Sequence, residues 1–138
     1  MKFEAAVAMV LALQFAAFGW RINREISVGD EGRQTWLPIS DYTNIVMFLV
    51  TVFICIVVPL ATGEFSNLSK AVLGSAVVFI AFHPMCTAAH YCLLTGKGRK
   101  HYIGKAGGYP YITYEEAVVY SIGISLAVMS GYCVYANA

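Results

Sequence analysis

The chain has 138 residues, of which 59% are hydrophobic and only 12% are charged. Soluble domains usually contain about 25% charged residues, so this composition is typical of an integral membrane protein. The formal net charge is +1, which gives no reason to expect a nucleic-acid partner.

Four segments are apolar enough and long enough to cross a bilayer, which needs about 20 helical residues. We expect transmembrane helices over residues 3–20, 42–62, 69–94 and 114–136. The first segment lacks a convincing small-residue cleavage site, so we interpret it as a retained helix rather than a signal peptide. No internal repeat or second domain is evident. The predicted fold is an all-α membrane protein, a single antiparallel four-helix transmembrane bundle over residues 1–138.

The distribution of lysine and arginine predicts how the helices are oriented. Four spans place both termini on one side of the membrane and the two long connections, 21–41 and 95–113, on the other. Lys2 and Lys70 are on the terminal side. The long connections hold the other basic residues, which are Arg21, Arg24, Arg33, Lys97, Arg99, Lys100 and Lys105. Because basic loops stay in the cytoplasm, we expect cytoplasmic connections and termini that are outside or lumenal.

Small residues at every fourth position predict where helix backbones approach closely in lipid. One such row lies in the first span and another in the fourth. They are Ala8, Ala12 and Ala16, and Ala117, Ser121 and Ser125. Thr113 and Glu116 form a capping-box pattern at the start of the fourth helix, and Asp41 or Thr43 is placed to cap the second helix.

Residues 82–92, FHPMCTAAHYC, contain two of the three histidines of the chain. His83, Cys86 and His90 lie on one helical stripe, but the two histidines are about 10 Å apart along the axis and cannot share a metal ion. No histidine, aspartate or glutamate lies deep in another span to complete a ligand set, so we expect no metal and no bis-histidine haem within one chain. The alternatives are histidines bonded to neighbouring helices, a substrate or cofactor pocket, or a haem shared between chains.

The connection TGKGRKHYIGKAGG, residues 95–108, is basic and rich in glycine. It is not a phosphate-binding P-loop, because its glycine spacing is wrong and Ala106 stands where a magnesium-binding hydroxyl would be. It either contacts lipid headgroups or binds a carboxylate or phosphate of a cytosolic ligand. Asn44, His90 and Tyr91 lie at the same membrane edge, so we expect them to converge with this loop on one cytosol-facing site. No carboxylate lies near mid-membrane, which argues against a proton pump or a cation-coupled transporter.

The layout resembles the MAPEG family, the membrane-associated proteins of eicosanoid and glutathione metabolism. The likeness lies in REISVGDEG, residues 24–32, followed by Asn44, and in His90-Tyr91 followed by a basic loop and Tyr114. The resemblance implies a homotrimer with a cytosol-facing site between subunits. There, glutathione would be conjugated to a lipophilic substrate, or would serve in its isomerisation. Glutathione is the implied cofactor, and its thiol would react as the thiolate.

Three positions that help to bind glutathione in the family hold Ser40, Met47 and Thr87 here. The chain's own basic residues would therefore have to act on the thiol, and we assign catalytic roles to Arg24 and Arg99. Seven residues are assigned to substrate or cofactor binding, namely Arg21, Asn44, His90, Tyr91, Lys97, Lys100 and Tyr114.

Two other functions stay open from the sequence. One is a non-catalytic accessory or structural subunit of a larger membrane complex, which would use its small-residue rows to pack against partners. The other is a subunit for electron transfer that binds haem or another cofactor. Membrane lipid is a partner in all three cases.

Overall fold

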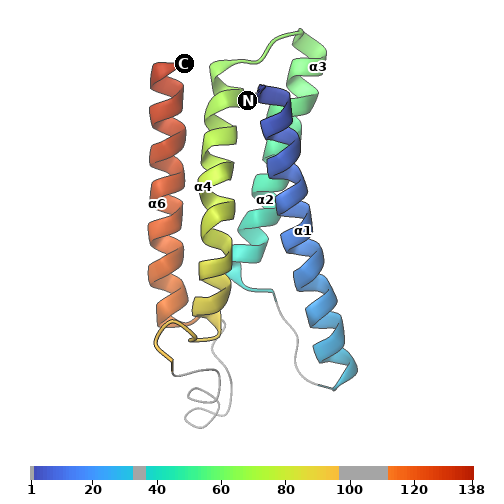
Figure 1. Cartoon of the computed structure of the whole chain (residues 1–138), viewed down its shortest axis with the longest axis vertical. Coiled ribbons are helices and arrows are strands. Elements are labelled where there is room, and N and C mark those ends of the chain that lie inside the picture. Colours follow the sequence, from blue (N-terminus) through green and yellow to red (C-terminus); the bar gives the residue numbers. More distant parts are fainter. Residues whose placement is uncertain (1, 33–36, 97–111) are drawn as a thin grey trace.

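The computed structural model describes residues 2–32, 37–96 and 112–138, and this part of the chain contains four helical segments of membrane-spanning length (Figure 1). In chain order the elements are α1 (Phe3–Asp30), α2 (Ile39–Val52), the π-helix η1 (Phe53–Val57), α3 (Val58–Thr62), α4 (Asn67–His90) and α6 (Tyr114–Asn137). The second span consists of α2, η1 and α3 end to end. The prediction of an all-α four-helix bundle is confirmed, and the chain is a multi-pass membrane protein.

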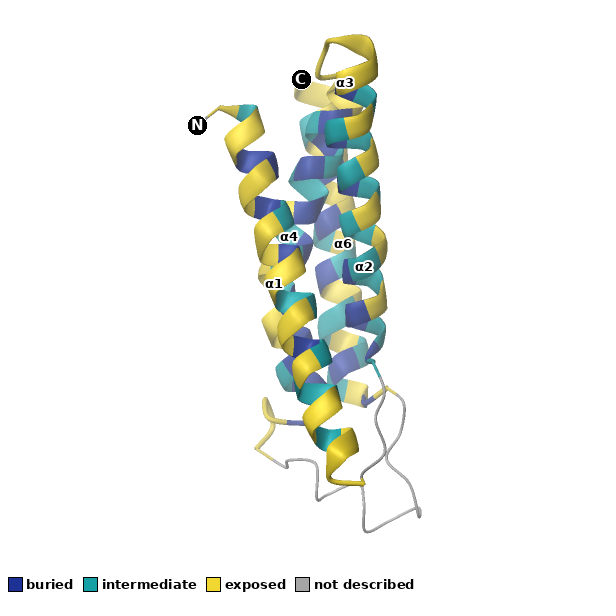
Figure 2. Cartoon of the chain, turned by 90° about the vertical axis from the view of Figure 1, so that its right-hand side faces the viewer, coloured by how far each residue is buried: buried dark blue, intermediate teal, exposed yellow. Residues whose placement is uncertain are grey.

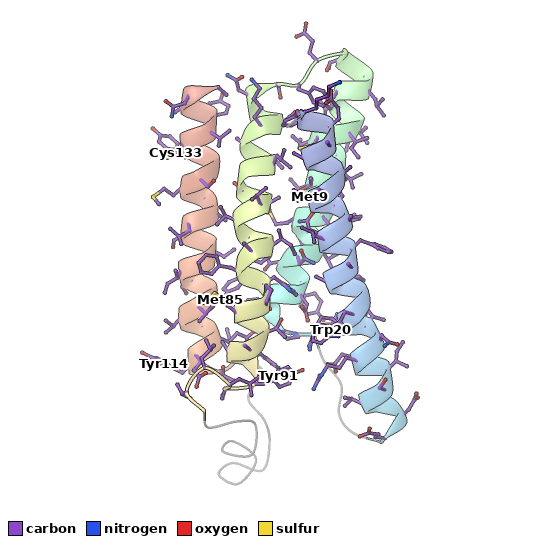
Figure 3. All side chains as sticks on the ribbon, in the orientation of Figure 1. Met9, Trp20, Met85, Tyr91, Tyr114 and Cys133 are labelled. Atoms are coloured by element: carbon purple, nitrogen blue, oxygen red, sulfur yellow. The ribbon has the colours of Figure 1, made fainter. Side chains whose placement is uncertain are left out.

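Helix α4 lies at the centre of the bundle. It contacts α1, α2 and α6, whereas α1 and α6 stand on opposite sides of it (Figure 1). Both termini lie at one end, which we call the terminal end; the α1–α2 and α4–α6 connections leave from the other, which we call the loop end. Buried residues face the interior and exposed residues face outward (Figure 2). Apolar side chains such as Met9 and Met85 are exposed on these outer faces, where the bilayer would cover them (Figure 3).

The first helix is longer than its apolar run. The prediction of a helix over 3–20 was wrong at its C-terminal end, because α1 continues to Asp30. Arg21 and Glu25 are one turn apart and form an ion pair of 3.3 Å, which favours the helical conformation beyond the apolar residues. Arg21 and Arg24 therefore lie on a helix, not in a loop as expected.

The third span is shorter than predicted at the loop end, since α4 ends at His90 rather than at Leu94. Cys92 adopts a left-handed conformation with φ of 54°. Its N–H bonds to the carbonyl of Ala89, and the N–H of the next residue bonds to the carbonyl of Ala88. This pair of bonds is a Schellman motif, which closes a helix and is usually built with glycine at the left-handed position.

The start of the second span also differs from the prediction. Helix α2 begins at Ile39, directly after Pro38, and neither Asp41 nor Thr43 caps it. The Thr43 hydroxyl instead donates to the carbonyl of Ile39 at 2.9 Å. Asp41 thus lies in the first turn, with its carboxylate directed into the bundle.

Pro59 leaves one carbonyl of the π-helical segment without a main-chain donor. In π-helical register the carbonyl of Ile54 would accept from the nitrogen of Pro59, which carries no hydrogen. The Ser69 hydroxyl of α4 donates to that carbonyl at 2.9 Å, and the Cys55 thiol lies 3.3 Å from the carbonyl of Ser69. Side chains of one span thus satisfy backbone groups of another, as a lipid environment requires.

Helices α4 and α6 approach each other through small residues, but not those predicted. Gly123, Ala127 and Gly131 are the buried small residues of α6, and a Cβ on Gly131 would overlap the Ser75 Oγ of α4. The predicted rows face outward instead. Their exposed members are Ala8, Ala12, Ala16, Ser121 and Ser125. The sequence showed small residues on two helices but could not show which face each helix turns inward.

Candidate functional site

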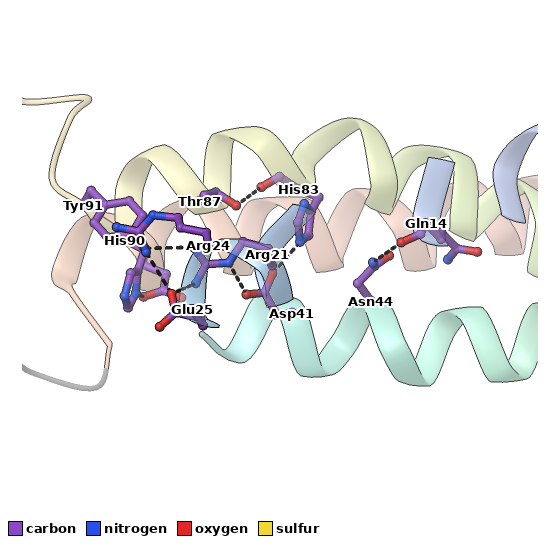
Figure 4. Close-up of polar contacts among 11 residues, drawn as sticks. Gln14, Arg21, Arg24, Glu25, Asp41, Asn44, His83, Thr87, His90 and Tyr91 are labelled. Carbon is purple, nitrogen blue, oxygen red and sulfur yellow. Dashed lines mark hydrogen bonds and ion pairs between the residues drawn. The ribbon is translucent and has the colours of Figure 1, made fainter. Parts of the chain in front are cut away.

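The loop end of the bundle contains a buried cluster of ionisable side chains from α1, α2 and α4 (Figure 4). The Arg21 Nε atom donates to Asp41 Oδ2 at 2.7 Å, and Asp41 Oδ1 lies 2.7 Å from His83 Nε2. Arg21 and Asp41 are at most 1% exposed. One carboxylate thus joins three helices, and it matches the charge of a guanidinium that would otherwise be costly inside a bilayer.

Arg21 makes two further contacts on the side that faces the loops. Its Nη1 atom donates to the Tyr91 hydroxyl at 2.8 Å, and its Nη2 atom lies 3.3 Å from Glu25 Oε1. The same Glu25 oxygen accepts from Arg24 Nη1 at 2.8 Å. The Arg24 guanidinium lies 4.4 Å from the centre of the Tyr91 ring, which is cation–π distance. We call Arg21, Arg24, Glu25 and Tyr91, together with Asp41, the loop-end cluster.

His90 belongs to a separate pair between α4 and α6. Its Nδ1 atom lies 2.7 Å from Glu116 Oε2, and both side chains are buried. The Thr113 hydroxyl accepts from the Glu116 N–H at 3.1 Å and donates to the carbonyl of Ala89 at 2.9 Å. The predicted capping box is therefore correct for Thr113 and wrong for Glu116, because the glutamate bonds to His90 instead of reaching back.

The predicted site residues fall into three groups. Arg21, Arg24 and Tyr91 lie together, although Arg21 and Tyr91 are far apart in the chain. Asn44 lies apart from them, bonded to the main chain of α1, and Tyr114 is 80% exposed on α6. Lys97, Arg99 and Lys100 lie outside the described residues.

Sequence reasoning assigned no site role to Asp41 or Glu116, because both were interpreted as helix-cap residues. A usable signal existed, since a histidine or arginine buried in lipid must find a partner and the acids at the span ends are the nearest candidates. Both histidines of α4 do bond to carboxylates of neighbouring helices. Within the described part of the chain, no group of three or more histidine, cysteine, aspartate or glutamate side chains is placed to hold a metal ion.

The loop-end cluster has no net formal charge, but it places one guanidinium at the edge of the membrane. The formal charges of Arg21 and Arg24 are matched by those of Asp41 and Glu25. Arg21 is fully buried, but the Arg24 side chain is 30% exposed and its ion pair with Glu25 is close to the surface. A partly exposed ion pair contributes about 0–1 kcal/mol, so an incoming anion can compete for the Arg24 guanidinium.

The chain was compared with protein-family models, with curated proteins and with solved structures. No family model, no curated protein and no solved structure matches the chain.

Proposed function

We propose that the chain is a MAPEG-like membrane protein, a homotrimer whose loop end faces the cytosol. There it would bind a small anionic thiol such as glutathione beside a lipophilic co-substrate. The observation that supports this function is that Arg21 and Arg24 of α1 meet Tyr91, the residue directly after α4, at the end where the basic connection 95–113 begins.

Each member of this trio has a distinct part in the proposed site. Arg24 would bind a ligand carboxylate through its planar guanidinium, which can make two parallel hydrogen bonds. Arg21 is held by Asp41 and donates to the Tyr91 oxygen. A hydroxyl that accepts from a guanidinium is polarised into a stronger donor, so Tyr91 would stabilise a thiolate. Bonding to the thiolate favours the nucleophilic form of the thiol.

The test is thermal unfolding of the purified protein with glutathione and with S-methylglutathione, which keeps the carboxylates but has no thiol. At a ligand concentration of about 100 times the dissociation constant, the expected stabilisation is about 2.7 kcal/mol. Arg24→Ala should lose this gain for both ligands while changing the unliganded protein little, because the side chain is partly exposed. Lys70→Ala, which removes a positive charge at the terminal end, is the matched control and should respond like the parent.

Two outcomes would contradict this proposal in different ways. If neither ligand shifts the unfolding of a well-folded sample, the enzyme function fails. If both ligands shift it and Arg24→Ala responds like the parent, binding is real but the site has been misplaced.

A second candidate function is a non-catalytic subunit of a larger membrane complex. It is favoured by the outward-facing small-residue rows on α1 and α6, which leave space for close contact with helices of another chain. Such a subunit would copurify with unlike chains in a mild detergent and show no response to glutathione. The proposed enzyme would purify as a homo-oligomer, which native mass spectrometry distinguishes.

A further inference from the structure

The side-chain amide of Gln14 is buried but makes no hydrogen bond within the described part of the chain. It lies on the inward face of α1 with 0% of its surface exposed, and neither its Oε1 nor its Nε2 atom has a hydrogen-bond partner among the described residues. Asn44 of α2 donates to the main-chain carbonyl of Gln14 at 3.1 Å, and its own Oδ1 atom is also without a partner there (Figure 4). The contact between the two helices thus uses the backbone of Gln14 and not its side chain.

An unpaired buried amide lowers the stability of the fold. Leaving a buried polar group unpaired costs about 1–3 kcal/mol, and a lipid environment has no water to relieve it. The three unpaired atoms are two acceptors and one amide nitrogen with two hydrogens. A residue that weakens the fold in this way is a candidate for binding something that completes its hydrogen bonds.

A cavity of about 220 Å³ lies beside these amides, between α1 and α2. Gln14 and Asn44 line it together with apolar side chains, which are Phe15, Phe18, Ile45, Phe48 and Leu49. Phe15 and Leu49 are 67% and 59% exposed, so the cavity opens toward the surrounding bilayer. Apolar cavities of about 150 Å³ bind benzene, so this one has room for a substituted six-membered ring.

We propose that this cavity binds a small lipophilic phenol that enters from the membrane. The phenol ring would contact the phenylalanine side chains of the cavity. The ring centroids of Phe15 and Phe48 are 6.3 Å apart, so these two rings already form one aromatic side of the cavity. The phenol hydroxyl donates to an amide oxygen and accepts from Gln14 Nε2. A hydroxyl is the smallest group that does both. A purely apolar ligand leaves the amides unpaired, and a carboxylate carries a charge into the bilayer at high cost.

This site is independent of anion binding by the loop-end cluster. Gln14 lies two turns from Arg21 on α1, about 10 Å along the axis. The cavity is lined by neither arginine. Loss of glutathione binding would therefore leave the proposal of a phenol site intact.

The experiment compares 4-fluorophenol with fluorobenzene, which have nearly the same size and differ in the hydroxyl. Binding to the full chain in lipid nanodiscs is measured by fluorine NMR, with empty nanodiscs correcting for partition into the lipid. The parent should prefer the phenol by about tenfold, which corresponds to about 1.4 kcal/mol. Gln14→Met, which keeps the length of the side chain, should reduce this preference to about threefold or less, because the hydroxyl loses both atoms of the Gln14 amide and retains only Asn44 Oδ1 as an acceptor.

One further measurement on Gln14→Met and two further variants make the outcome decisive. Gln14→Met should also raise the melting temperature without ligand, because it removes unpaired atoms and no observed hydrogen bond. Leu49→Trp should fill the cavity and weaken both probes. Asn137→Met removes an exposed amide at the far end of α6 and should keep the preference of the parent. Equal binding of the two probes by the parent overturns the proposal, as does an undiminished preference in Gln14→Met or undiminished binding of both probes by Leu49→Trp.

Discussion

Asp41 is the residue on which the polar interior of the loop end depends. Its two oxygens bond to Arg21 from α1 and to His83 from α4, and its own backbone belongs to α2. A buried ion pair contributes little net stability compared with apolar residues, but removing one partner leaves an uncompensated buried charge. The carboxylate is therefore far more important to the folded chain than its single formal charge suggests.

Asp41→Asn should lower the free energy of unfolding by about 3–5 kcal/mol, because the buried Arg21 guanidinium loses its matching charge. The measurement is a reversible titration of the purified protein into SDS, followed by circular dichroism. Glu64→Gln is the matched control. It removes a carboxylate from an exposed turn, where substitutions usually change stability by less than about 0.5 kcal/mol. An equally small effect of Asp41→Asn would show that the cluster is hydrated rather than buried.

The histidines of α4 were hard to interpret from the sequence because their hydrogen-bond partners lie on other helices. Their stripe left open a contact with another helix, a substrate or cofactor pocket and a haem shared between chains, although no metal was expected within one chain. The structure places a carboxylate 2.7 Å from one ring nitrogen of each histidine. A buried pair of this kind needs two helices at a defined rotation, and no pattern within one helix specifies that rotation.

Helix pairing depends on where a Cβ atom can be placed. Gly123, Ala127 and Gly131 recur every four residues on α6, which forms a narrow inward face against α4. A Cβ on Gly131 would overlap Ser75 Oγ and would lie 3.2 Å from the carbonyl oxygen of Ala71. Close backbone approach of this type is a main source of attraction between helices in lipid, where apolar burial contributes little.

Gly131→Ala should lower the free energy of unfolding by about 1–3 kcal/mol, since overpacking forces α4 and α6 apart. Gly19→Ala is the matched control, because nothing lies within 4 Å of its added Cβ and alanine is the better helix former. The double variant Gly131→Ala/Ser75→Ala should recover part of the loss, because it removes the overlapping hydroxyl. SDS titration of the three variants tests this, and a loss in Gly19→Ala equal to that in Gly131→Ala would attribute the effect to backbone freedom instead.

At the scale of the whole molecule, the two ends of the bundle differ in chemistry. The loop end contains the loop-end cluster and the buried His90–Glu116 pair. At the terminal end the charged residues are exposed or only partly buried, and they are Lys2, Glu4, Glu64 and Lys70. The excess of lysine and arginine in the loop-end connections supports the proposal that this end faces the cytoplasm.

Labelling of single cysteines tests that orientation in intact cells. Cys133 is the exposed one of the four cysteines, so Cys133→Ser provides a background with only buried thiols. A cysteine at Gly63 should react with a membrane-impermeant maleimide added from outside, and one at Gly29 should react only after the cells are opened. Reaction of Gly29→Cys in intact cells would reverse the orientation and remove the cytosolic thiol from the proposed site.

The sequence predicted the positions of the helices better than their ends. Apolar runs of about 20 residues were sufficient for four spans, because spanning a bilayer imposes that length on any sequence. The predicted helix ends were wrong where polar contacts determine the position at which a helix ends. Helix α1 continues through the Arg21–Glu25 turn, and α4 ends at the left-handed Cys92. The sequence predicted that Asn44, His90 and Tyr91 would converge with the basic loop, but it did not pair Tyr91 with Arg21. The partners Asp41 and Glu116 were assigned to caps.

Composition and hydropathy alone determined that this chain is an all-helical, multi-pass membrane protein, since lipid admits few ways of satisfying the backbone. Only the tertiary structure decided which face each helix buries. That rotation turns Ala8, Ala12 and Ala16 outward, brings Gln14 beside a cavity and pairs Asp41 with two other helices. The physical reason is that a membrane helix is apolar on its lipid-facing side as well as over much of its buried side. The periodicity that identifies the buried face of a soluble helix is therefore weak here, and hydrogen bonds and close packing between helices determine the rotation.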